Sequence, residues 1–150
     1  MHRYLVVADL AVGARELKDF VRSRDDNERS AFHLVVPTHP DRRRLTWEET
    51  EARFVARRRL EQGLAWIRET DPRADGEVGD VDPMLAIEDA LRETTYDAIV
   101  LAIRERPHRR RTNVAARARQ TFDLPVVDVL GTPPVLSGRP ESTPIMRQTA

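Results

Sequence analysis

Short runs of apolar residues, separated by longer stretches of mixed polarity, divide this chain. Four runs are almost continuously apolar, which is typical of strands buried on both faces of a parallel sheet. They cover residues 4–8, 32–36, 98–103 and 124–130. A fifth segment, residues 74–79, alternates small or apolar residues with charged ones. This weaker pattern predicts a short strand at an edge of the sheet.

The stretches between the first strands have the apolar spacing of helices. Residues 13–24 predict a short amphipathic helix. A long second helix follows, and residues 46–49 at its start have the spacing of a capping box. Its expected apolar face consists of Ala52, Ala56, Leu60, Leu64 and Ile67.

Two further helices are predicted from their polar first residues. Asp82 followed by Pro83 is a favoured helix start, and Thr112 or Asn113 can cap a last helix with Phe122 on its inner face. Strands and helices then alternate along the chain and end on a strand. This order predicts an α/β fold with a doubly wound, five-stranded parallel sheet and helices on both faces.

The domain organisation follows from where this pattern stops. One α/β domain is expected over residues 1–130, because a chain of 150 residues with 40% apolar content suits a single core. From residue 131 to residue 150, proline, serine and threonine replace the apolar periodicity. This composition predicts a flexible tail.

The composition indicates which cell compartment and which classes of binding partner to expect. The 25 basic residues balance the 25 acidic ones, so no overall field favours nucleic acid or a membrane surface. The longest apolar run is too short to cross a bilayer, and residues 5–8 are too short for the core of a signal peptide. The absence of cysteine agrees with a reducing compartment. We therefore expect a cytoplasmic protein that binds neither nucleic acid nor membranes.

The residues that most often perform catalysis or bind metals do not form a recognisable set. No serine is flanked by glycines as a nucleophile, no phosphate-loop lysine occurs, and no acidic pair has a catalytic context. The histidines lack metal-ligand spacing, and we interpret each as a surface or strand-end residue. They are His2, His33, His39 and His108. We expect no metal, no catalytic residue and no enzymatic activity.

Four local strings, taken in their order, resemble the universal stress protein family over roughly residues 3–130. They are 4–9 (YLVVAD), 79–87 (GDVDPMLAI), 97–102 (DAIVLA) and 124–129 (LPVVDV). The resemblance implies a Rossmann-like fold of the adenine nucleotide alpha hydrolase type, with strand order 3-2-1-4-5, and a role in stress responses. Ligands of such open sheets bind where the strand order reverses, at the carboxyl ends of the strands.

The implied crevice lies between the first and fourth strands. It would be edged by Asp9, Leu10, Ile103 and Arg104, with Val36 at the end of the second strand as a further candidate. In the family such an aspartate contacts the adenine or ribose of the ligand. An aspartate at a strand end can instead cap the next turn. Both interpretations of Asp9 stay open.

The phosphate site of the family is missing from this sequence. Family members that bind ATP hold its phosphates on a loop with several glycines after the fourth strand, because only glycine lets backbone amides approach phosphate closely. None of the six glycines here lies between residues 80 and 130, and residues 104–113 instead read RERPHRRRTN. We therefore expect no ATP cofactor bound in the family's usual way.

The arginine-rich loop that replaces the glycines has two interpretations. It can bind a phosphate or carboxylate through guanidinium groups and the start of the last helix. The residues concerned are Arg104, Arg109, Arg110, Arg111, Thr112 and Asn113. It can equally be a solvated loop, since arginine is abundant throughout the chain. The first interpretation gives an alternative function, binding of ATP, AMP or another small anion by Asp9 and residues 104–111.

The last strand is the expected contact with a second copy of the chain. Family members usually form dimers by pairing this strand with its two-fold mate, and an apolar edge strand left unpaired invites aggregation. The residues of this tentative interface are Val126, Val127, Asp128 and Val129. The expected function is that of a non-catalytic, homodimeric module similar to a universal stress protein.

Overall fold

The computed structural model describes residues 1–24, 29–38, 49–104 and 113–131. Within these ranges, strands and helices alternate as the apolar pattern predicts. Their bounds are β1 His2–Ala8, α1 Arg15–Ser23, β2 Ser30–Pro37, α2 Glu49–Ile67, β3 Asp75–Gly79, α3 Pro83–Glu93, β4 Ala98–Ala102, α4 Val114–Thr121 and β5 Val126–Asp128. Of the predicted tail, only residue 131 belongs to the described ranges.

The five strands form one sheet in the order β3-β2-β1-β4-β5, and all neighbours are parallel. This arrangement confirms the predicted doubly wound fold. The strand β3 lies at one edge, as expected from its weak pattern, and β5 lies at the other. The strand order reverses between β1 and β4, which is where sheets of this kind are expected to bind ligands.

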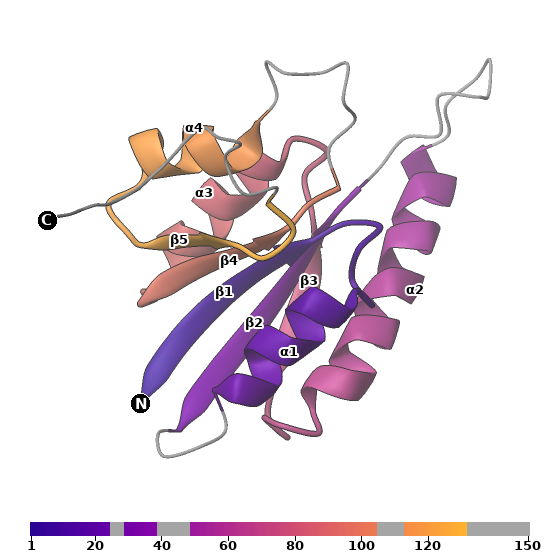
Figure 1. Ribbon diagram of the computed structural model, residues 1–150. Helices are drawn as coiled ribbons and strands as arrows, with labels where there is room; N and C mark the ends of the chain where they lie inside the picture. The colour runs from indigo at the N-terminus through magenta and orange to yellow at the C-terminus, as the bar shows by residue number, and fades with distance from the viewer. Residues whose placement is uncertain (25–28, 39–48, 105–112, 132–150) are drawn as a thin grey trace, which may run out of the picture.

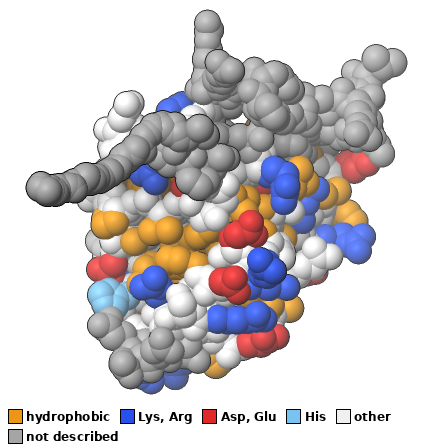
Figure 2. Space-filling view, viewed as in Figure 1, with side chains coloured by type: hydrophobic (Ala, Val, Ile, Leu, Met, Phe, Trp, Pro, Cys, Tyr) orange, Lys and Arg blue, Asp and Glu red, His pale blue; other side chains and the backbone are white. Residues whose placement is uncertain are grey.

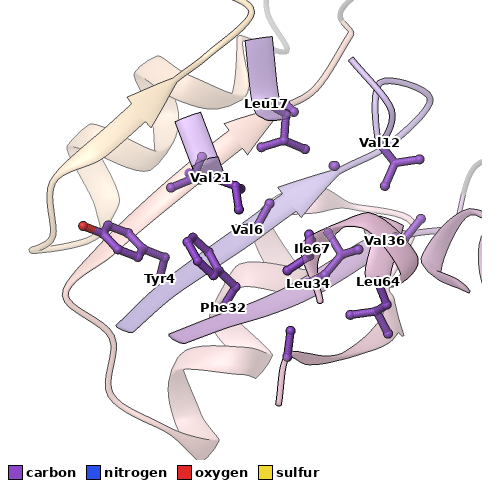
Figure 3. Close-up of a cluster of buried hydrophobic side chains, with 14 of the residues drawn as sticks. Tyr4, Val6, Val12, Leu17, Val21, Phe32, Leu34, Val36, Leu64 and Ile67 are labelled. Atoms are coloured by element: carbon purple, nitrogen blue, oxygen red, sulfur yellow. The ribbon is translucent and has the colours of Figure 1, made fainter. Parts of the chain in front are cut away.

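Helices cover both faces of the sheet (Figure 1). The helices α1 and α2 lie on one face, and α3 and α4 lie on the other. Two apolar clusters fill the layers between helices and sheet. One contains Leu17, Leu34 and Ile67 on the α1 and α2 side, and Figure 3 shows Leu34 and Ile67 next to each other in it. The other cluster contains Ile87 and Ile99.

The near-continuous apolar runs are explained by this three-layer structure. Successive strand residues point to opposite faces, so a strand covered on both faces needs apolar residues at every position. In β1 every residue from Tyr4 to Ala8 is buried. The predicted apolar face of α2 is also buried throughout. The capping box proposed at residues 46–49 lies mostly outside the described residues, which resume at Glu49.

Two glycines let the chain pack closely around Leu34. A Cβ atom at Gly63 in α2 would lie 2.6 Å from Leu34 Cδ2 and 2.6 Å from Val12 Cγ2. A Cβ atom at Gly76 in β3 would meet the backbone carbonyl oxygen of Leu34 and lie 2.7 Å from Leu60 Cδ1. Neither site has room for a side chain, so these glycines set how closely α2 and β3 approach β2.

The helix starts predicted from capping residues are present. The side chain of Asp82 accepts a hydrogen bond from the amide of Met84 at 2.9 Å, with Pro83 as the first residue of α3. The side chain of Asn113 accepts from the amide of Ala116 at 3.0 Å and caps α4. Thr112, the alternative cap, lies outside the described residues.

The end of the domain differs from the prediction in two details. The helix α4 stops at Thr121, so Phe122 has extended backbone angles and is not part of the helix. The strand β5 has 3 residues rather than the span 124–130. It ends early because the amide of Gly131 donates to the carbonyl of Asp128 at 3.3 Å, which turns the chain away from β4.

Candidate functional site

Asp9 follows β1 at the point where the strand order reverses, and it is buried, with 7% of its surface exposed. Its carboxylate accepts a hydrogen bond from the amide of Ala11 at 3.2 Å. It also accepts from the amide of Arg104, at 3.1 Å on Oδ1 and 3.2 Å on Oδ2. Asp9 therefore caps its own turn and also ties it to the chain that follows β4. The capping interpretation describes these contacts.

A hollow of about 450 Å³ opens at the carboxyl ends of β4 and β5, beside the start of α4. Three of the residues predicted from sequence line it, namely Ile103, Arg104 and Asn113. Arg119 from α4 and Asp128 from β5 also line it, and neither was predicted to bind a ligand. The parallel strands bring these residues together, because their carboxyl ends share one edge of the sheet.

The hollow has a mixed set of charges. Two arginines, Arg104 and Arg119, and two acids, Glu16 and Asp128, line the hollow. Among the described residues no ion pair joins either arginine to either acid. With two arginines and two acids, the described lining of the hollow is balanced in charge. Arg104 and Asn113, which flank residues 105–112 in the sequence, are part of this lining.

The remaining predicted ligand residues do not converge on this hollow. Leu10 is exposed, at 46%, on the turn after β1. Val36 is fully buried in the apolar cluster under α1 and α2 (Figure 3), so its side chain packs in the core. The other candidates lie outside the described residues. They are Arg109, Arg110, Arg111 and Thr112.

Within the described ranges, no group of three histidine, aspartate or glutamate side chains is placed to hold a metal ion. His33, however, is neither a surface nor a strand-end residue as predicted. It lies inside β2, with 18% of its side chain exposed, and its two ring nitrogens lie 2.8 Å from Asp75 Oδ1 and 2.9 Å from Glu77 Oε2. The imidazole thus links β2 to the edge strand β3.

A second hollow, of about 860 Å³, lies at the opposite, amino end of the strands and includes His33, Asp75, Glu77 and Tyr96. Burial raises the pKa of the Tyr96 phenol, and the negative charges of Asp75 and Glu77 raise it further. Of these groups, His33 bonds to Asp75 and Glu77, and these bonds add to the backbone pairing of β2 with β3.

In the described residues no helix is long and apolar enough to cross a bilayer.

No protein-family model matches the chain, and neither does any curated protein. Among solved structures, the chain matches with a probability of 1.00 the crystal structure of a protein from the universal stress protein family from Burkholderia pseudomallei. The TM-score is 0.58 and the sequence identity is 20%, over 84% of this chain and 93% of that chain. At this identity the likeness establishes the fold and not the roles of single residues. The chain therefore has the fold of the universal stress protein family.

Proposed function

We propose that this chain is a non-catalytic, cytoplasmic module of the universal stress protein type that works as a homodimer through β5. The position of β5 carries this proposal, because it is the outer strand of the sheet next to β4. Its residues Val126 and Val127, together with Val129 just beyond, are only half-buried. Pairing with the same strand of a second copy would bury them.

The face of the sheet near β5 supports the same proposal. In Figure 1 the helix α1 lies in front of β2 and β3, with α2 beside it, and no helix lies in front of β5. Figure 2 shows hydrophobic side chains gathered on this face beside α1. An apolar surface next to an unpaired strand edge is a common site of self-association.

The oligomeric state is tested by sedimentation velocity over a range of protein concentrations. We expect a dimer for the wild type and a monomer for Val126→Pro. Proline at this position removes an amide that faces away from β4, so the β4 pairing and the fold should survive. A circular dichroism spectrum equal to that of the wild type verifies the fold. A wild type that stays monomeric at micromolar concentration contradicts the dimer.

We further propose that ATP is not held here in the way the family resemblance implies. The sequence between β4 and α4 has no glycine, the residue that lets backbone amides approach phosphates closely. The carboxylate of Asp9, the candidate for adenine or ribose, already accepts bonds from two backbone amides. Both features favour a structural role for this edge over the binding of ATP.

The hollow at the carboxyl edge favours a second candidate function, binding of a small anion. Arg104 and Arg119 present guanidinium groups there, and the loop 105–112 adds further positive charge in its sequence. Inorganic phosphate should then raise the melting temperature of the wild type and have a smaller effect on Arg104→Ala, because a ligand stabilises only the state that binds it. Equal responses of the two proteins to phosphate would remove this candidate.

A further inference from the structure

The backbone groups at the free edge of β5 can be identified from its pairing with β4. The amide of Ile99 donates to the carbonyl of Pro125 at 2.9 Å, and the amide of Val129 donates to the carbonyl of Leu101 at 3.0 Å. In a parallel pair, alternate residues of a strand bond to the same neighbour. The amide and carbonyl groups of Val126 and Asp128 therefore face away from β4, toward the edge where a second strand would pair.

Both outward carbonyl groups already have donors within the chain. Arg119 Nη2 donates to the carbonyl oxygen of Val126 at 3.2 Å. The amide of Gly131 donates to the carbonyl oxygen of Asp128 at 3.3 Å. A pairing strand needs outward acceptors as well as outward donors. Strand addition at Val126 would therefore compete with the guanidinium group of Arg119 for this carbonyl.

The same arginine also lines the hollow at the carboxyl edge. Arg119 lies in the last turn of α4, and its side chain reaches the hollow as well as the carbonyl of Val126. Arg104 and Asn113 line that hollow from the ends of the arginine-rich loop. An anion there would attract the guanidinium group more strongly than a neutral carbonyl does, because the two opposite charges add a Coulomb attraction to the hydrogen bond.

We propose that Arg119 links anion binding in this hollow to strand pairing at β5. Without an anion, Arg119 donates to Val126 and closes the edge. With an anion bound, the guanidinium group turns to the ligand and leaves the Val126 carbonyl to a second copy of the chain. Such a link is reciprocal, so dimer formation also tightens anion binding. The inference rests on the proposed homodimer, and it adds that an anion in the hollow regulates dimer formation.

The test compares the dimer dissociation constants of the wild type, Arg119→Ala and Arg117→Ala, measured by sedimentation equilibrium in chloride and in inorganic phosphate at equal ionic strength. Arg117 is the matched control, since it is an exposed arginine of the same helix that does not line the hollow. In chloride, Arg119→Ala should dimerise about tenfold more tightly than the wild type, because neither copy has an Arg119 bond to displace. Phosphate should strengthen the dimers of the wild type and of Arg117→Ala and leave that of Arg119→Ala unchanged.

Other results would show that the link is wrong, and they distinguish a failure of the link from a failure of the proposed homodimer. If all three proteins dimerise equally in chloride and respond equally to phosphate, the dimer stands and the role of Arg119 is wrong. If Arg119→Ala dimerises more tightly but phosphate changes no protein, Arg119 blocks the edge without responding to an anion, and the link is wrong. If all three stay monomeric in both salts, the proposed homodimer is wrong and the link with it.

Discussion

The contacts of Asp9 make its removal the most informative single perturbation of the carboxyl edge. In Asp9→Ala the amides of Ala11 and Arg104 lose a buried charged acceptor. Hydrogen bonds to charged groups contribute about 1.5 to 3 kcal/mol each, and lengths of 3.1 to 3.2 Å place these two near the lower value. We therefore expect the free energy of unfolding to fall by about 3 kcal/mol. For a chain of this size the melting temperature then falls by about 6 to 12 °C.

Urea unfolding and thermal melting, both without added ligand, measure this loss. Asp9→Asn keeps one acceptor oxygen and should lose about half as much as Asp9→Ala. Asp80→Ala is the matched control. Asp80 also follows a strand and accepts from the amide two residues later, Asp82, at 2.9 Å, but it is exposed, so its removal should cost less than about 1 kcal/mol. If Asp9→Ala melts like the wild type, Asp9 does not hold the turn, and the ligand interpretation of Asp9 is favoured instead.

Three further predictions concern the scaffold. Gly76→Ala places a Cβ atom against the backbone of β2 and should cost about 2 to 3 kcal/mol in urea unfolding, whereas Gly13→Ala, where a Cβ atom meets nothing within 4 Å, should change the stability by less than about 0.5 kcal/mol. Asn113→Ala removes the cap of α4 and should lower the free energy of unfolding by about 1 kcal/mol, most of which Asn113→Ser should restore. The phenol of Tyr96 should ionise above its ordinary pKa of 10.0 in an ultraviolet absorbance titration, and Glu77→Gln should lower that pKa only part of the way, because burial is the larger cause. Since the folded state disfavours the phenolate, Tyr96 should reduce stability as the pH rises above 10.0.

The arrangement of the fold could be predicted because it depends on patterns that are local in the chain. Continuous apolar runs marked β1, β2 and β4, which are largely buried, and the weak alternation at residues 74–79 marked an edge strand. The run 124–130 was misleading, because β5 is an edge strand and only half-buried. Helix starts were predictable where a side chain bonds to an amide two or three residues later, as at Asp82 and Asn113. The end of β5 was not, because it depends on one turn bond to Gly131 rather than on apolarity.

The candidate site was predicted only in part, because its contacts join residues far apart in the sequence. Asp9 and Arg104 are separated by 95 residues, so no local pattern shows that one holds the other. Arg119 reaches the hollow only because α4 packs beside β5, and its position in the helix gives no sign of this. Asp128 did carry a signal. As an acidic residue at the carboxyl end of a strand, it belongs to the same edge as Asp9, yet it was assigned to the dimer interface alone.

His33 shows the same limit for the opposite edge of the sheet. Its sequence neighbours are apolar, and nothing near it in the chain suggests two carboxylate partners. Those partners, Asp75 and Glu77, come from the next strand in space, 42 and 44 residues later. The alternation of charged residues in β3 predicted an exposed edge strand, and it also places both acids on the face that meets His33.

This chain has the fold of the universal stress proteins, and we propose that its carboxyl edge does not hold ATP in the family's usual way. Calorimetric titration of the wild type with ATP and Mg²⁺ tests it most directly, with a universal stress protein that carries the glycine loop as the positive control. We predict no micromolar binding to this chain under conditions in which the control binds. Micromolar binding of ATP to this chain would contradict the claim.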